Sequence, residues 1–332
     1  MSKNQYKSIC KRITDRIISF LDDGIIPWNK PWVGGSFNAP RSVSTGKIYR
    51  GANLVILSAA GYSSPWWLTF GQARKLGGAV RKGERSYPIH YWKFPKVQDC
   101  PKCGGSDTQN CTHCDENGKY IGKFARLFSF NVFNATQVDG LPEKYYETIE
   151  APKGCEFDPV EKAEDIVHVY AKVYYEDKLA ERSEYLNDNP PKVFHDQSDR
   201  NYYIPSKDEI HLCEKDQFIS VEEYYSTLFH EFTHSTGHES RLDRDSLTGD
   251  NFFGSHGYSK EELVAEFGSA FLCGIAGIDK DDVVKNSAAY IQSWKKKLEE
   301  NTDWIVWAGS RAAKATDHIL GTEYTKDDTD DK

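Results

Sequence analysis

Apolar residues recur at helical spacing near the start of the chain, which predicts an amphipathic helix over residues 6–22 that ends at a glycine. The residues on its apolar face are Ile9, Ile13, Ile17, Ile18 and Leu21. The segment IPWNKPW that follows contains prolines and tryptophans and predicts an ordered loop. Residues 54–57 predict a buried segment, and a short helix is expected from Thr69 to Gly77-Gly78.

Two strand-like segments, residues 86–94 and 123–138, lie on either side of a cysteine-rich stretch at 98–116. Their aromatic and β-branched content predicts a long hairpin that this stretch caps. With the preceding helices, the hairpin completes a small α+β domain that we predict over residues 1–140. Prolines and glycines between 140 and 154 indicate a linker, which we place at 141–155.

The second half of the chain is patterned mainly as helix. A helix is predicted over 161–174, followed by short strands near 192–195, 201–204 and 209–212. Further helices are predicted over 221–236, 260–276, about 284–300 and about 303–320. The fold class is therefore α+β in two domains: the second is mainly helical with a small sheet over 156–322, and an acidic disordered tail follows at 323–332.

The net charge of −8 divides unevenly along the chain. Residues 1–140 contain 20 Lys and Arg against 9 Asp and Glu, whereas the remainder contains 22 against 41. A basic first half is typical of a segment that meets a polyanion, although two solvated surfaces of opposite sign would give the same count. No apolar run is long enough for a membrane helix, and the N-terminus does not resemble a signal peptide. We therefore expect a cytoplasmic protein in a reducing compartment, with no membrane partner.

The motif HEFTH at residues 230–234 has the spacing of a zinc-hydrolase site. His230 and His234 are four residues apart, so in a helix they share one face and can hold one metal ion. Glu231 lies beside them, close enough to take a proton from a metal-bound water. The helix is predicted independently, because residues 220–223 have capping-box form. The alternative is a buried histidine pair on a core helix.

A catalytic zinc takes three protein ligands and leaves one position for water. The segment SKEELVAEFGSAFL places Glu262 and Glu266 four residues apart on one helical face. We predict Glu262 as the third ligand, with Glu266 orienting a histidine or serving as the alternative ligand. The alternative for Glu262 is a capping role, because Ser259 precedes it by three residues. His238 is expected to support the site or lie at the surface.

A peptide is the expected substrate of this site. The predicted strand DEIHL, just before the metal helix, offers an edge along which an extended peptide could pair. Zinc-activated water would attack the carbonyl, with Glu231 acting as base and then as proton donor. The sequence does not identify the protein that is cleaved.

The cysteine-rich stretch contains two CxxC pairs separated by seven residues, a pattern typical of a closed structural zinc site. Its four thiolates belong to Cys100, Cys103, Cys111 and Cys114. A redox function is the alternative. Two zinc ions are thus predicted, one catalytic and one structural.

Aromatic and cationic residues alternate through the first half of the chain. Cations neutralise phosphates and aromatic faces stack on unpaired bases, so this mixture favours single-stranded nucleic acid, although some of the tryptophans are expected in the core. The candidate DNA-binding residues are Trp28, Lys30, Trp32, Arg41, Lys47, Tyr49, Arg50, Trp66, Arg81, Lys82, Trp92 and Lys93.

Several long segments together resemble the ArdC family of antirestriction proteins. In the first half they are GIIPWNKPW, TGKIYRGANLVIL, WWLTFGQARKLGGAVRKGE and FNVFNATQVDGLP; in the second they are YYSTLFHEFTHSTGHESRLDR, EELVAEFGSAFLCGIAGI and AAYIQSWKKKL. The resemblance implies an N-terminal single-stranded-DNA-binding domain, a zincin-like metallopeptidase domain, and an origin on a plasmid or another mobile element. It also implies metal binding at His230 and His234 and catalysis by Glu231.

The N-terminal half is also similar to that of plasmid primases, but the remainder carries no polymerase motif. The insert CPKCGGSDTQNCTHC departs from the family pattern. The expected function is that of an antirestriction-type protein, from a plasmid or phage and acting in a bacterial host, that binds single-stranded DNA and hydrolyses peptide bonds. The alternative is a DNA-binding protein that occludes DNA without proteolysis and uses the zincin fold as a scaffold.

Overall fold

The computed structural model describes residues 3–29, 38–93, 97–100, 102–103, 119–121, 125–147, 159–175, 178–179, 189–248, 256–278 and 288–322. Its fold is α+β, with small sheets among long helices, as the sequence predicts. None of the helices in these ranges combines the length and hydropathy needed to cross a bilayer.

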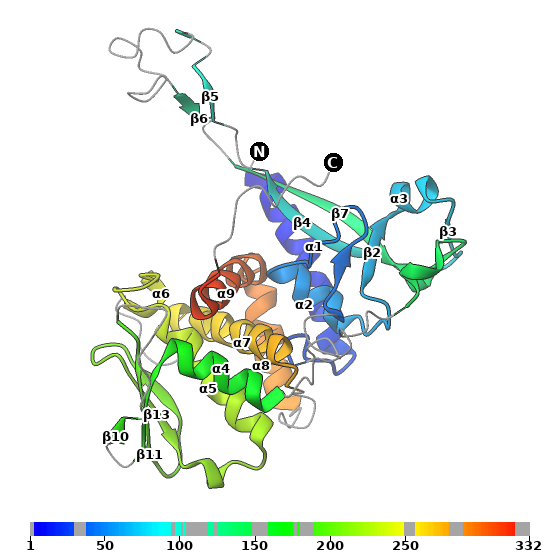
Figure 1. Cartoon of the computed structure of the whole chain (residues 1–332). Coiled ribbons are helices and arrows are strands. Elements are labelled where there is room, and N and C mark those ends of the chain that lie inside the picture. Colours follow the sequence, from blue (N-terminus) through cyan, green and yellow to red (C-terminus); the bar gives the residue numbers. More distant parts are fainter. Residues whose placement is uncertain are drawn as a thin grey trace.

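The N-terminal part places a mixed sheet against a long first helix (Figure 1). Its helices are α1 (Lys3–Asp22), α2 (Ala52–Ala59) and α3 (Phe70–Lys75). Its strands are β1 (Arg41–Ser42), β2 (Trp66–Thr69), β3 (Ala79–Val80), β4 (Tyr87–Lys93), β5 (Val97–Asp99), β6 (Lys119–Ile121), β7 (Arg126–Asn134) and β8 (Val138–Asp139). The main sheet has the order β1-β2-β7-β4.

The predicted hairpin is confirmed, because β4 pairs antiparallel with β7 along its whole length. The short pair β5–β6 continues the hairpin away from the rest of the chain (Figure 1). The expected short helix is α3, whose N-cap Thr69 forms a capping box with Gln72. Gly78 follows this helix where an added Cβ would lie 2.7 Å from Leu141, so glycine allows the chain to pass closely.

The C-terminal part places helices against one face of a five-stranded sheet. Its helices are α4 (Pro159–Tyr170), α5 (Val221–Ser235), α6 (Asp245–Thr248), α7 (His256–Ala276), α8 (Ala288–Glu300) and α9 (Trp304–Leu320). Its strands are β9 (Lys172–Tyr175), β10 (Lys178–Leu179), β11 (Lys192–Gln197), β12 (Tyr202–Ile204) and β13 (Glu209–Cys213). The sheet order is β10-β9-β11-β13-β12.

Two local expectations differ from the structure. The helix predicted to continue to residue 174 ends at Tyr170, and strand β9 starts at Lys172 and pairs with β11. Val173 and Tyr174 therefore belong to the sheet. The apolar residues keep helical spacing up to this point, but pairing with a neighbouring strand outweighs that local preference. The strand near 209–212 is confirmed as β13, but it lies inside the sheet, between β11 and β12.

The two halves share a hydrophobic core. Its N-terminal members come from α1, α2 and the main sheet, and its C-terminal members come from α7, α8 and α9. Trp28 illustrates the contact, with its ring packed against Phe267 at 5.5 Å and Trp294 at 5.6 Å between centroids. The predicted bounds 1–140 and 156–322 remain predictions. Within the predicted linker, Leu141 and Tyr145 are buried in a small cluster with β2 and β8 residues, whereas residues 148–155 and the tail 323–332 lie outside the described ranges.

Candidate metal centre and nucleic-acid pocket

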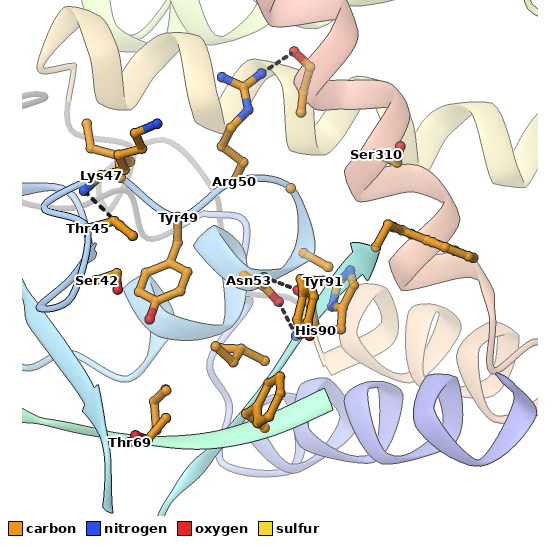
Figure 2. A pocket seen from close by; sticks show the side chains of 18 of the residues that line it. Ser42, Thr45, Lys47, Tyr49, Arg50, Asn53, Thr69, His90, Tyr91 and Ser310 are labelled. Carbon is orange, nitrogen blue, oxygen red and sulfur yellow. Dashed lines mark hydrogen bonds between the residues drawn. The ribbon is translucent and has the colours of Figure 1, made fainter. Parts of the chain in front are cut away.

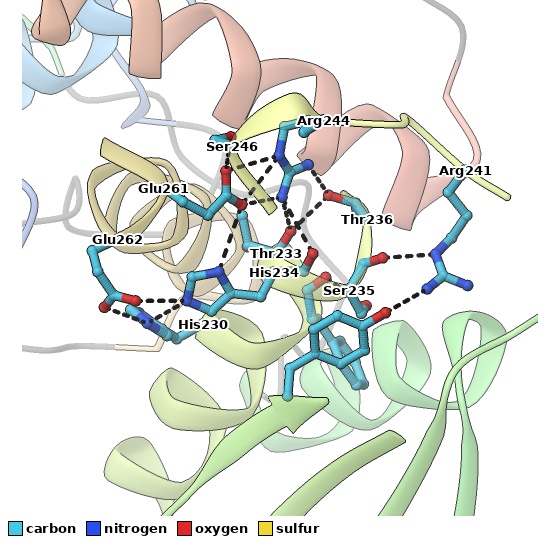
Figure 3. A network of polar contacts seen from close by, with 12 residues as sticks. His230, Thr233, His234, Ser235, Thr236, Arg241, Arg244, Ser246, Glu261 and Glu262 are labelled. Carbon is cyan, nitrogen blue, oxygen red and sulfur yellow. Dashed lines mark hydrogen bonds and ion pairs between the residues drawn. The ribbon is translucent and has the colours of Figure 1, made fainter. Parts of the chain in front are cut away.

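Helix α5 carries the HEFTH motif and is built to hold it rigidly. Ser220 is the N-cap and accepts a hydrogen bond from the backbone N–H of Glu223, which satisfies one of the free amides of the first turn. Leu228, Phe229 and Phe232 are completely buried in the core that joins the helix to the sheet. The buried face fixes the rotation of α5, and His230 and His234 lie together on another face (Figure 3).

His230, His234 and Glu262 bring three possible ligand atoms together, the one such group of metal-ligating side chains among the residues that the structure describes. The two Nε2 atoms are 3.2 Å apart, and the Glu262 carboxylate lies 3.3 Å from His234 and 3.6 Å from His230. Ligands at ~2.1 Å from a tetrahedral ion are separated by about 3.4 Å. The donor set and its spacing therefore fit one divalent cation, with a further position open to solvent.

The capping alternative for Glu262 is wrong. Helix α7 begins at His256, so Ser259 lies within the helix and not at its N-cap. Glu262 is thus free of the N-terminal role and directs its carboxylate at the two imidazoles (Figure 3).

Glu266, predicted as the supporting or alternative ligand, is placed elsewhere. Its carboxylate accepts a 2.8 Å hydrogen bond from the Tyr290 hydroxyl, which in turn accepts one from the indole of Trp28 at 3.3 Å. It therefore joins α7 to α8 and to the N-terminal half, and it is not part of the cluster of ligand atoms. Helical spacing alone puts Glu262 and Glu266 on one face but does not show which partner each meets.

Glu261 occupies the supporting position that the sequence analysis assigned to Glu266. Its carboxylate lies 3.5 Å from Nδ1 of His234, the nitrogen opposite the one that faces Glu262. Arg244 donates to Glu261 from Nε at 3.1 Å and from Nη2 at 2.5 Å, and Ser246 donates to it at 2.6 Å. A carboxylate behind a histidine ligand fixes the orientation of the ring and makes it a stronger ligand.

Charges around His234 are strongly coupled. Burial acts against a charged imidazole, but Glu261 and Glu262 raise the pKa of His234 to about 10. Burial likewise acts against ionised Glu261, yet Arg244 and His234 lower the pKa of its carboxyl to about 2. A cation that binds at His234 must displace its proton, so metal affinity should fall as the pH is lowered.

Glu231 is buried beside the imidazoles, with 6% of its surface exposed. Burial raises the pKa of Glu231, and His230 and His234 oppose that rise. The backbone N–H of Tyr203 on β12 also donates to this carboxylate. A carboxyl group whose pKa is raised towards neutral pH is suited to accept a proton and return it.

A second network ties strand β12 to the end of the metal helix. Arg241 donates to the backbone oxygen of Ser235 at 2.8 Å and to Asp208 at 2.9 Å, and Tyr203 donates to Asp208 at 2.8 Å. Asp208 adopts a positive φ of 56° in the turn between β12 and β13. His238 bonds to Ser240 at 2.8 Å and is not among the clustered ligand atoms.

The edge strand next to the metal centre is β12 and not β13. Because β13 has a neighbour on each side, its backbone groups are already paired and it cannot add a peptide. Within the part of the chain that the structure describes, strand β12 is paired on one side only. The expectation that DEIHL supplies the edge is therefore wrong, because among the described strands the outer one at this side of the sheet is Tyr202–Ile204.

The candidate DNA-binding residues divide into those that line a common pocket and those that do not. The pocket has a volume of about 780 Å³ and lies between the main sheet, α2, α3 and α9 (Figure 2). Lys47, Tyr49, Arg50 and Trp92 line it, whereas their binding to DNA remains a prediction. The sequence analysis missed other lining residues, among them Lys75, Phe130, Ser310 and Lys314.

Trp28 requires a correction. Its side chain is 1% exposed and packs between Phe267 and Trp294, so no face of its ring is open to a base. A tryptophan in a proline-rich loop next to a helix is as well suited to a core as to a binding surface, and here the core formed by both halves covers it.

The remaining candidates lie outside the pocket lining. Trp66 packs edge-on against Tyr145 at 5.6 Å, and Arg41 donates to the backbone oxygen of Gly46 at 3.4 Å. Arg81 is exposed and paired with Glu84 and Asp139. Lys82 and Lys93 are exposed, and Lys30 and Trp32 lie outside the described residues.

The predicted structural zinc site is described only in part. Cys100 is buried and Cys103 is half-buried, whereas Cys111 and Cys114 lie outside the described residues. The four-cysteine site therefore remains a prediction.

Comparison with known proteins finds two family models that match separate parts of the chain. Residues 7–133 match the family model described as the N-terminal domain of anti-restriction factor ArdC, and residues 181–311 match that of a zincin-like metallopeptidase. Two DNA primases TraC of Escherichia coli are 38% and 36% identical over 96% and 94% of this chain, which spans 27% and 20% of their lengths. The uncharacterized protein y4eC of Sinorhizobium fredii is 31% identical over 93% of this chain and 90% of its own.

Solved structures of the antirestriction protein ArdC from plasmid R388 are also similar. The metal-free form is 31% identical, covering 95% of this chain and 99% of that one, with a TM-score of 0.62. The Mn(II)-bound form is 32% identical, covering 97% and 98%, with a TM-score of 0.61. Fold and site together define a protein that joins an ArdC-type N-terminal domain to a zincin-like metallopeptidase domain. The chain belongs to the ArdC family of antirestriction proteins.

Proposed function

We propose that the C-terminal half hydrolyses peptide bonds with a divalent cation, zinc in the first instance, held by His230, His234 and Glu262. The observation that carries this proposal is the separation of 3.2–3.6 Å between the three donor groups, with Glu231 directly after His230 in the chain and on the same helix as both histidines. Bound at these residues, the cation would supply a Lewis acid that polarises a carbonyl and makes water more acidic.

The other side chains of the site have separate roles in the proposed reaction. Glu231 accepts a proton from the attacking water and returns it to the leaving amine, since its buried carboxyl has a raised pKa. Glu261 holds the His234 ring in place through Nδ1. An extended peptide would pair with the free edge of β12, whose Tyr203 backbone already reaches Glu231.

The pocket between the main sheet, α2, α3 and α9 is proposed as the site for single-stranded DNA. Its lining contains four cations, Lys47, Arg50, Lys75 and Lys314, against one carboxylate, Asp317. Burial lowers the pKa of His90 to about 4, so this further lining residue stays uncharged at neutral pH. The balance suits a polyanion.

Aromatic rings complete the pocket. Tyr91 stacks on Phe130 with ring centroids 5.4 Å apart and planes 12° from parallel, and Phe130 is 43% exposed. An exposed ring next to cations can stack on an unpaired base, which a duplex does not offer.

Binding of a labelled single-stranded oligonucleotide should weaken about 20- to 50-fold between 50 and 200 mM salt, as expected for three to four phosphate contacts. The substitution Lys75→Glu should weaken binding and flatten this salt dependence. Arg74→Glu is the matched control, because Arg74 is the neighbouring exposed residue of α3 and does not line the pocket. Fluorescence anisotropy provides the measurement. Affinity that does not vary with salt, or equal effects of the two substitutions, would contradict the proposed DNA site.

The second candidate function is occlusion of DNA without proteolysis. It is favoured by the separation of the two sites, since none of the pocket-lining residues belongs to the metal cluster. Transfer of unmodified DNA into a restricting host distinguishes the two candidates: a Glu231→Gln protein that still protects the DNA supports occlusion, whereas loss of protection supports proteolysis. We also propose that the protein acts in the cytoplasm of a bacterial host, on DNA of a plasmid or phage. A second, structural zinc ion at the four cysteines is part of the proposed function as well.

A further inference from the structure

The pocket proposed for single-stranded DNA is not made by the N-terminal half alone. One of its walls is α9, which comes much later in the chain and contributes Ser310, Ala313, Lys314 and Asp317. Figure 2 shows Ser310 on this helix, across the pocket from Tyr49 and Thr69. Ser310 and Lys314 are exposed, one turn apart, and Lys314 has no carboxylate partner among the residues that the structure describes.

Helix α9 is held firmly against the N-terminal half. Arg50, at the start of the pocket, pairs with Asp317 at 2.5 Å, which neutralises the only carboxylate of the lining. At the same contact Gly309 lies so close to α2 that an added Cβ would be 2.4 Å from the backbone nitrogen of Ala52. Glycine at this position lets the two helices approach. The wall is therefore in place before any ligand binds.

The same helix belongs to the metallopeptidase half. Its buried residues Ile305, Ala308 and Ala312 are in one core with Leu263 and Phe267 of α7, the helix that carries Glu262. The family match for the zincin-like domain extends to residue 311. A wall of the pocket is thus part of the domain that holds the metal centre.

We propose that Lys314 and Ser310 of α9 are nucleic-acid-binding residues, so that the metallopeptidase half supplies one side of the single-stranded DNA site. This inference rests on the proposed DNA-binding function of the pocket. Lys314 would contact a backbone phosphate. The DNA strand would run between the aromatic side chains of the pocket and α9, and Ser310 would lie against it. A strand in this pocket touches both halves at once.

The test uses the full chain and two kinds of substitution. Lys314→Glu should weaken binding of a single-stranded oligonucleotide about 5- to 10-fold and reduce its salt dependence. Because a reversed charge also acts over roughly 10 Å at 0.1 M salt, a neutral change is needed as well. Ser310→Trp narrows the pocket without altering charge and should weaken binding by a similar factor.

The matched controls are Lys296→Glu and Ser293→Trp on α8. Both residues are exposed and neither lines the pocket, so both variants should bind like the unchanged protein. Thermal unfolding of each variant checks that the fold is kept. If Lys75→Glu weakens binding but both α9 substitutions do not, the inference is wrong and the proposed DNA function stands. If none of the three weakens binding, the proposed DNA site itself is wrong.

Discussion

Replacing Glu231 by glutamine is expected to lower peptide hydrolysis about 10²- to 10⁴-fold while the protein keeps its metal. Glutamine has the size of the carboxyl but cannot accept a proton, and Glu231 is not one of the three clustered donors. The fold should remain, because the substitution replaces a buried carboxyl by a neutral amide. The raised pKa of Glu231 shows that burial already disfavours the charged form of this carboxyl. Hydrolysis is measured by mass spectrometry on a library of unstructured peptides incubated with the zinc-loaded protein.

Glu239→Gln is the matched control, because Glu239 is exposed just beyond the same helix and should be replaceable without effect. Metal content of both variants, measured by atomic emission, separates a lost base from a lost ion. Peptide products formed equally fast by the Glu231→Gln variant and the unchanged protein would remove the base from the mechanism.

Replacing Arg244 by alanine is expected to lower the free energy of unfolding by about 3–5 kcal/mol. The Arg244 side chain is 5% exposed and that of Glu261 is 3% exposed, so the change leaves a buried carboxylate without its partner. Arg244 also donates to the backbone oxygen of Thr233 at 2.7 Å, which ties the end of α5 to the loop after it. Urea unfolding of the metal-free protein measures the loss.

The matched control is Arg200→Ala, which breaks an exposed pair with Asp199 and should cost about 1 kcal/mol or less. Arg244→Ala should also weaken metal binding about 10- to 100-fold, since Glu261 would no longer be held behind His234. Adding Glu261→Gln to Arg244→Ala should restore part of the stability, because no uncompensated charge remains. Equal costs of the Arg244 and Arg200 substitutions would show that the buried pair does not stabilise the site.

Local patterns in the sequence were enough to predict the grouping of His230, His234 and Glu262 but not the residues that support them. The positions of His230 and His234 follow from one helical turn, and Glu262 follows from the need for a third ligand. Glu261 could not be chosen over Glu266, because the choice depends on Arg244, which reaches it from the loop after α5. The buried pair is a tertiary contact that periodicity does not encode.

The order of the strands in the sheet could not be predicted from the sequence for a similar reason. The alternation of apolar residues predicts that β13 is a strand, but both an inner and an edge strand can show it. Its parallel neighbour β11 and antiparallel neighbour β12 are fixed only when the chain folds. The burial of Trp28 and the shape of the pocket also could not be predicted from local sequence. Helix α9, which carries Lys314, contacts Arg50 and Gly51 more than 250 residues away in the chain, and such a contact leaves no local pattern.

The proposed hydrolysis requires that two imidazoles and the Glu262 carboxylate hold a single ion. Diffraction data collected at the zinc absorption edge from a zinc-soaked crystal test it most directly. We expect an anomalous peak roughly 2.0–2.2 Å from Nε2 of His230, Nε2 of His234 and a carboxylate oxygen of Glu262. A fully soaked crystal with no peak between these three side chains would contradict it.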